Sequence, residues 1–102
     1  MDRAEMLKQV LERNPNDAFA RYGLAMEYSR AGEIENALAQ FKKLLELHPD
    51  YVAGYQMAGQ MLSAAGRSEE ARRMLESGIG CAQRAGNKHA QEEMQALLQE
   101  LR

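Results

Sequence analysis

Residues 29–41 read SRAGEIENALAQF and residues 63–75 read SAAGRSEEARRML, so nearly the same pattern occurs twice, 34 residues apart. Gly32 and Gly66 hold the same place in the two stretches, and strong helix formers surround both. Glycine suits the left-handed position just past a helix C-terminus, where a side chain with a Cβ would be strained. Each stretch therefore predicts the end of one helix, a tight turn and the start of the next helix.

Two proline turns divide the chain at the same period. Asn14-Pro15-Asn16-Asp17 and His48-Pro49-Asp50 lie 34 residues apart. Proline disfavours helix in the residue before it, and Asn or Asp can cap the helix that follows. Gly86 predicts a third glycine turn, and no stretch alternates apolar with polar residues over the length of a strand. The pattern predicts six helices, at roughly 2–13, 17–31, 34–47, 51–65, 68–84 and 88–101.

Small residues recur where paired helices would cross. Ala25 and Gly59 lie near the middle of the first helix of each pair, and Ala37 and Ala71 lie early in the second. Small side chains let two helix backbones approach toward the short end of the usual ~8–10 Å spacing. One helical hairpin cannot bury its apolar surface alone, whereas stacked hairpins can, and a period of about 20–50 residues is typical of such stacking.

Composition excludes several classes of protein. The chain has 102 residues, 45% apolar and 27% charged, which fits one domain, and its formal charge of −2 is spread without a block of one sign. This argues against a nucleic-acid or anionic-membrane surface. No apolar run approaches the ~18 residues of a membrane span, so we expect a cytoplasmic protein. Cys81 is the single cysteine; it predicts a small buried hydrophobe and no internal disulfide.

These features resemble the tetratricopeptide repeat family. Its pattern of Trp, two residues, Leu-Gly, two residues, Tyr, then Ala, three residues, Phe, then Pro is matched at Leu24, Tyr28, Ala37, Phe41 and Pro49. Arg21 replaces the Trp and Ala25 replaces the Gly. The second unit keeps Gly59 and Ala71 but has Gln83 in place of Pro, which allows the fifth helix to continue past the usual end of a repeat. Gly78 and Gly80 argue for the alternative, an earlier end, because glycine is unfavourable inside a helix.

The resemblance implies an all-α fold, a right-handed α-solenoid of stacked antiparallel helical hairpins in one domain, 1–102. Residues 2–15 resemble a half-unit helix, 17–50 a first repeat, 51–84 a second repeat and 87–102 a closing helix that caps the array. The implied function is a non-catalytic protein–protein interaction module without a cofactor, which binds a peptide segment or helix of a partner protein in a concave groove.

Carried over by position, the groove takes side chains from three helices. They are Phe19, Tyr22, Met26, Ser29 and Arg30 from the first, Gln56, Gln60 and Ser63 from the next, and Asn87, Ala90 and Met94 from the closing helix. Methionine and aromatic residues adapt to apolar side chains, and amides and hydroxyls can bond a peptide backbone. An alternative for Phe19 and Met26 is simple packing under the half-unit or the closing helix.

One known version of this groove is not expected here. Some family members hold chaperone C-termini with a carboxylate clamp that needs Lys and Asn, and Tyr22 and Met26 stand at those places. Arg30 alone is a poor anchor for a carboxylate, which needs several converging donors, and its other interpretation is a solvated charge at a helix end.

A metal site is the enzymatic alternative, and the residues argue against it. His89 and Glu92 lie three residues apart on one helix and could supply two ligands, but neither His48 nor Cys81 has a spacing that supports a third. We expect a surface pair of His89 and Glu92, with no metal. Phosphate loops, nucleophile elbows and paired cysteine motifs are missing from the sequence.

The alternative function is a structural protein that self-associates through an uncapped end face. Solenoids need polar end faces for solubility. The last helix offers Gln91, Glu92, Gln95, Gln99 and Glu100, and the first offers Asp2, Arg3, Glu5, Lys8, Gln9 and Glu12. Because both ends read as polar, we expect a monomeric adaptor, with a homodimer as the alternative.

Overall fold

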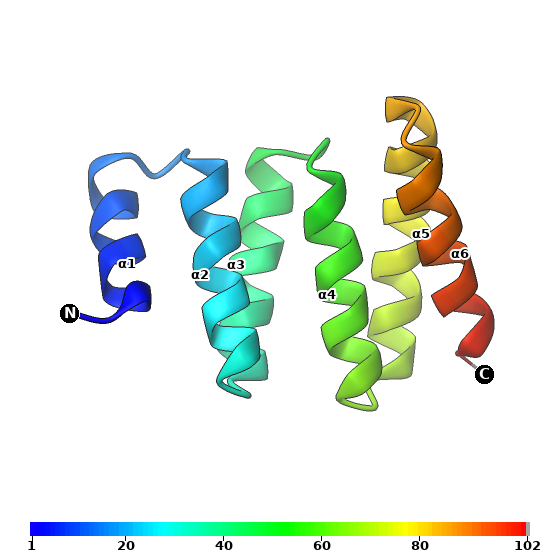
Figure 1. The fold of residues 1–102 in the computed structure, drawn as a ribbon, viewed down its shortest axis with the longest axis horizontal. Coiled ribbons are helices and arrows are strands. Elements are labelled where there is room, and N and C mark those ends of the chain that lie inside the picture. The colour runs from blue at the N-terminus through cyan, green and yellow to red at the C-terminus, as the bar shows by residue number, and fades with distance from the viewer. Residues whose placement is uncertain (102) are drawn as a thin grey trace. The chain divides into compact units, whose positions relative to one another are not determined.

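A computed structural model describes residues 1–101 and shows six helices and, over that range, no strand (Figure 1). The helices are α1 (Arg3–Arg13), α2 (Ala18–Arg30), α3 (Ile34–Leu47), α4 (Val52–Ala64), α5 (Ser68–Ala85) and α6 (Lys88–Glu100). The expected all-α fold is confirmed, and each helix begins and ends close to its predicted bounds. Arg102, the last residue of the expected closing segment, lies outside the described residues. The chain divides into two compact units, Met1–His48 (unit 1) and the chain from Pro49 onward (unit 2).

Glycine turns end the helices where the sequence predicts them. Gly32, Gly66 and Gly86 have φ of 77°, 77° and 71°. At the first turn, the backbone N–H of Glu33 donates to the carbonyl of Tyr28 at 2.9 Å. This bond satisfies a carbonyl that the last turn of α2 would otherwise leave unpaired, and only glycine adopts the required left-handed backbone without strain.

Side-chain caps start three of the helices. The Oδ1 atom of Asp2 accepts from the backbone N–H of Glu5 at 2.9 Å, and that of Asp17 accepts from Ala20 at 2.9 Å. Asn87 caps α6 by accepting from the backbone N–H of Ala90 at 3.1 Å. Each cap satisfies one of the backbone donors at a helix N-terminus, so the Asp and Asn residues fix where these helices begin.

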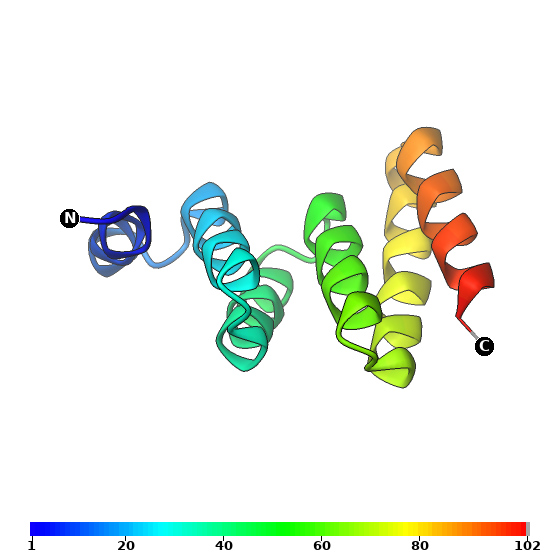
Figure 2. The ribbon, with the colours of Figure 1, turned by 60° about the horizontal axis from the view of Figure 1, so that its bottom comes forward.

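In unit 1, α2 lies between α1 and α3 (Figures 1 and 2). Leu11 of α1 packs with Ala20 and Leu24 of α2, and Ala25 and Ala37 are fully buried. The burial of these two alanines agrees with the small residues expected at the helix crossing, which let α2 and α3 pack closely.

The opposite face of α1 differs from the expected polar end. Its predicted polar residues are exposed, but Met6 and Val10 lie among them with 54% and 41% of their surface exposed. Apolar side chains at positions four apart share one helix face. The outer side of α1 is therefore polar in part, because two exposed apolar side chains lie among its polar residues.

In unit 2, α5 lies between α4 and α6 (Figure 2). Leu75 of α5 packs in one core cluster with Ala90 and Met94 of α6. A Cβ added to Gly59 of α4 would lie 2.5 Å from Leu75 Cδ2 of α5. There is thus no room for a side chain at position 59, where α4 packs on Leu75. The expected small residue at this crossing is confirmed.

The helix α5 is longer than the other five helices of the described chain. This agrees with Gln83, which stands where the first repeat has the helix-ending Pro49. It has 18 residues and ends at Ala85. Gly78, in its middle, is buried, and an added Cβ there would lie 2.6 Å from both Met94 Sδ and Tyr55 Cβ. The glycine thus allows α4 and α6 to approach α5 at the same level. Across residues 1–101, none of the helices combines the length and apolar character that a bilayer-spanning segment requires.

Candidate functional site

An aromatic and methionine stripe lies along α2, formed by Phe19, Tyr22 and Met26 (the α2 stripe). Their spacing of three and four residues places them on one helix face. Phe19 is 70% exposed, and Tyr22 and Met26 are half-buried. The Tyr22 ring meets the ring of Phe41 edge-on, with centroids 6.5 Å apart and an angle of 69°. Because most of its surface is exposed, Phe19 does not pack in the core. Tyr22 contacts the buried Phe41 ring and also reaches the surface.

At the end of α2, Ser29 is half-buried and Arg30 is engaged in an ion pair. The Nη1 atom of Arg30 lies 3.3 Å from Glu27 Oε2, and the Nε atom of Arg3 lies 3.4 Å from the same oxygen. Glu27 therefore divides its charge between two guanidinium groups. Exposed ion pairs of this kind are weak. The guanidinium of Arg30 therefore remains open to solvent while it also contacts Glu27.

The helix α4 carries an amide and hydroxyl stripe made of Gln56, Gln60 and Ser63 (the α4 stripe). Gln60 is exposed, and the other two are half-buried. The Nε2 atom of Gln56 donates to Glu93 Oε1 of α6 at 3.0 Å. The stripe is therefore polar where the α2 stripe is apolar, although the two occupy equivalent repeat positions.

Glu93 is a residue that sequence reasoning missed. Its Oε1 atom lies 3.4 Å from His89 Nε2 and also accepts from Gln56. The predicted surface pair of His89 with Glu92 is thus wrong in its partner, since the structure pairs His89 with the residue four positions on rather than three. Both spacings bring side chains together on a helix, so the sequence favoured neither.

The closing helix contributes less to an open surface than expected. Asn87 is exposed but its Oδ1 caps α6, and Ala90 and Met94 are buried, Met94 completely. Met94 packs in the core of unit 2, as its closeness to Gly78 shows. The assignment of Ala90 and Met94 to a groove is therefore corrected: the apolar face of α6 covers α5.

A second cluster in unit 2 surrounds the carbonyl of Pro49. The Tyr55 hydroxyl donates to this oxygen at 2.9 Å, and the Cys81 thiol donates to it at 3.5 Å. Beside them, Asp50, Cys81 and Arg84 line a depression of about 290 Å³. Burial raises the pKa of the Cys81 thiol above its ordinary value of 9.0, with Arg84 opposing the effect.

This cluster fits a structural role. Desolvation also raises the pKa of Tyr55, and the nearby Cys81 adds to the effect. A thiol is a nucleophile or metal ligand as the thiolate, which a raised pKa makes scarce near neutral pH. No group of three or more His, Cys, Asp or Glu residues within the described chain is arranged to hold a metal ion. The bonds to Pro49 instead fix the start of α4 against the end of α5.

Comparisons with known proteins find two matching family models and one similar curated protein. A family model described as tetratricopeptide repeat matches residues 28–101, and a second with the same description matches residues 6–39. A TPR repeat-containing protein of Pseudomonas aeruginosa is 34% identical over 97 residues, which are 95% of this chain and 92% of that protein.

Two solved structures are also similar. The tetratricopeptide repeat domain protein of Salinibacter ruber matches with a TM-score of 0.78 and 32% identity, over 86% of this chain and 89% of that one. YrrB, described as a TPR protein with an unusual peptide-binding site, matches with a TM-score of 0.69 and 31% identity, over 76% of this chain and 40% of that one.

Proposed function

We propose, from the premise that the chain belongs to the tetratricopeptide repeat family, that it is a non-catalytic module that binds a segment of another protein. The α2 stripe of unit 1 offers one contact surface for this segment, and the α4 stripe of unit 2 offers another. The observation that carries this proposal is the exposure of Phe19, 70% of whose surface is open, on the same face as Tyr22 and Met26. Aromatic and methionine side chains are enriched at the centres of binding surfaces and depleted on ordinary protein surfaces.

The α2 stripe would take the apolar side chains of the ligand. The flexible thioether of Met26 adapts to irregular apolar groups. The rings of Phe19 and Tyr22 offer a large apolar area and lose little side-chain entropy on binding. Tyr22 adds a hydroxyl that can bond a peptide group. We therefore expect ligands with at least one aromatic or branched aliphatic side chain, and an affinity near the micromolar range, about −8 kcal/mol.

The α4 stripe would bond the ligand backbone. Because the Nε2 atom of Gln56 already donates to Glu93, its Oε1 atom is the part suited to accept a peptide N–H. Glu93 places a carboxylate beside this position and disfavours an acidic ligand residue there. The likeness to YrrB, a TPR protein with an unusual peptide-binding site, supports a peptide as the ligand.

The test begins with a peptide selected from a displayed random library and titrated by calorimetry. Replacing Phe19 and Gln56 together by Ala should weaken its binding at least tenfold, about 1.4 kcal/mol, because energy concentrates in a few central positions. Phe19 is preferred to Tyr22 in this pair because Tyr22 also contacts Phe41. The double change Tyr22→Ala with Gln56→Ala should weaken binding to a similar or larger extent.

The matched control replaces Lys42 and Arg72 by Ala. Both lie on second helices of the hairpins, and the ion pair of Arg72 with Glu69 is long, at 3.9 Å. We expect the control to bind normally and all variants to retain the helical circular dichroism spectrum. The proposal fails if the control pair abolishes binding while the stripe variants bind as well as the unmodified chain.

A further inference from the structure

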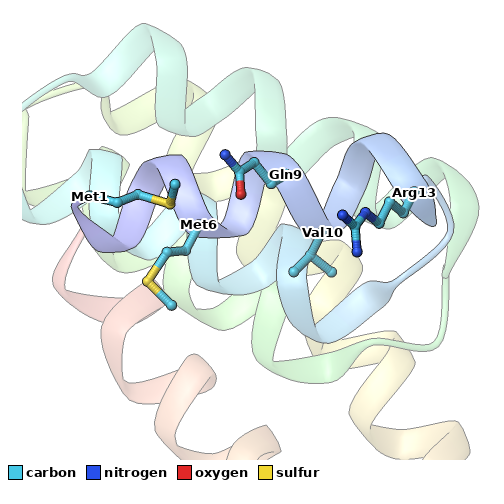
Figure 3. A pocket seen from close by; sticks show the side chains of 5 residues that line it. All are labelled: Met1, Met6, Gln9, Val10 and Arg13. Atoms are coloured by element: carbon cyan, nitrogen blue, oxygen red, sulfur yellow. The ribbon is translucent and has the colours of Figure 1, made fainter.

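The surface of α1 that points away from α2 forms an apolar depression of about 410 Å³. It is lined by Met1, Met6, Gln9, Val10 and Arg13, which we call the α1 outer face (Figure 3). Leu7 and Leu11 occupy the other side of the helix and pack on α2. Exposed Met6 and Val10 have no role in the proposed peptide site, and contiguous apolar patches on a soluble protein mark interaction sites.

The repeat in the sequence argues against a hairpin partner on this face. With Pro15 aligned to Pro49, α1 takes the register of α3, and Arg3 stands where α3 has Ala37. Ala37 is fully buried at a helix crossing, whereas the Arg3 side chain turns toward α2, where it pairs with Glu27. The α1 outer face therefore lacks the small residue with which α3 meets its hairpin partner, so a helix of the repeat does not fit closely on it.

The charges at the two ends of the face indicate what the occupant is. Asp2, Met6, Gln9 and Arg13 are spaced by four, three and four residues, so they form one line along α1 with an acid at its start and a base at its end. A second α1 laid antiparallel across this line would bring each Asp2 opposite an Arg13. No ion pair within residues 1–101 engages Arg13, and the cap bond of Asp2 uses only its Oδ1.

We propose that the α1 outer face pairs with the same face of a second copy of the chain, antiparallel and related by a two-fold axis. The axis passes between Met6 and Gln9, so each Met6 lies opposite Gln9 of the second copy, close to the axis, and Val10 packs beside it. A self-complementary patch of this kind is what a two-fold dimer requires. Asp2 and Arg13 form two equivalent ion pairs at the rim.

The size of the face sets the strength of the dimer. A helix of 11 residues is roughly 16 Å long, so one face covers much less than the ~1,200 Å² that a stable interface buries. We expect a dimer in rapid exchange with the monomer, populated at high concentration. The association is therefore compatible with peptide binding by the monomer.

The first experiment is sedimentation velocity of the full chain from about 10 µM to about 1 mM. The average mass of the unmodified chain should rise with concentration, and Met6→Lys should keep it monomeric, because two like charges would be buried close together beside the axis. Gln95→Lys, an exposed position of α6, is the matched control and should dimerise normally. A monomer at every concentration, or a dimer unaffected by Met6→Lys, overturns the proposal.

The second experiment tests the antiparallel register. Asp2→Asn keeps a good helix cap but removes the charge, and Arg13→Gln removes the opposite charge. Each change alone should weaken dimerisation roughly twofold to tenfold. If the two residues pair with each other, the double variant should be no weaker than either single variant. Losses that simply multiply in the double variant would overturn the pairing.

Discussion

Two glycines in α5 show how the same residue has opposite effects at neighbouring positions. A Cβ at Gly78 would lie 2.6 Å from Tyr55 Cβ and Met94 Sδ, whereas one at Gly80 would meet only the end of the Arg84 side chain, at 3.4 Å. Methionine can move, but a Cβ atom cannot move without its backbone. The first glycine is therefore required by packing and the second is not.

This contrast gives a prediction for the free energy of unfolding. Gly78→Ala should lower it by about 1–3 kcal/mol through overpacking, partly offset by better helix propensity. Gly80→Ala should raise it by up to about 1 kcal/mol, since the flexible end of Arg84 can shift and the helix gains. Urea unfolding followed by circular dichroism measures both. Equal effects of the two changes would contradict the close approach of α4 and α6 at Gly78.

Arg21 shows at the residue scale what the family pattern could not predict. It stands where the pattern has Trp, and its guanidinium donates to Gln40 Oε1 and to the carbonyl of Pro15, both at 2.9 Å. The side chain thereby ties α2 to α3 and to the turn before α2. The sequence alone did not show why an arginine stands at a position where the family pattern has an apolar residue. The hydrogen-bond partners of Arg21 in the folded chain show it.

At the scale of helices, the hairpin of α2 and α3 depends on the small side chain of Ala37. This residue is fully buried, while Ala39 on the same helix is exposed. Ala37→Leu should lower the free energy of unfolding by about 1–3 kcal/mol, because the extra methylenes push the helices apart. Ala39→Leu should change it by less than about 0.5 kcal/mol. Thermal unfolding of both variants tests this, and an unchanged melting temperature for Ala37→Leu would count against the crossing.

Sequence patterns specified the helices well because local interactions set their ends. Glycine turns and Asp or Asn caps act within a few residues, so Gly32 and Asp17 could be read directly. The candidate site was harder, because a helix position does not say which neighbour covers it. Met94 is a residue type common in binding surfaces, but it is buried against α5. Met6 lies among polar residues in the sequence, and its side chain is exposed.

For the chain as a whole, the cluster at Pro49 makes stability depend on pH. The pKa values of Cys81 and Tyr55 are both raised, chiefly by burial, from ordinary values of 9.0 and 10.0. Well below pH 9 both groups keep their protons whether the chain is folded or unfolded. Above it, the unfolded chain releases a proton that the folded chain retains, so the unfolded state gains stability.

We therefore expect the free energy of unfolding to fall as the pH rises from about 9 toward the raised pKa values. Cys81→Ala should make this fall shallower, because only Tyr55 then contributes. The slope with pH is the informative quantity, since a smaller side chain lowers stability at every pH by leaving a cavity. Urea unfolding in a reducing buffer measures both chains between neutral pH and about pH 10. Identical slopes would show that the Cys81 thiol ionises equally well in the folded and unfolded chains, and that Pro49 does not hold it protonated.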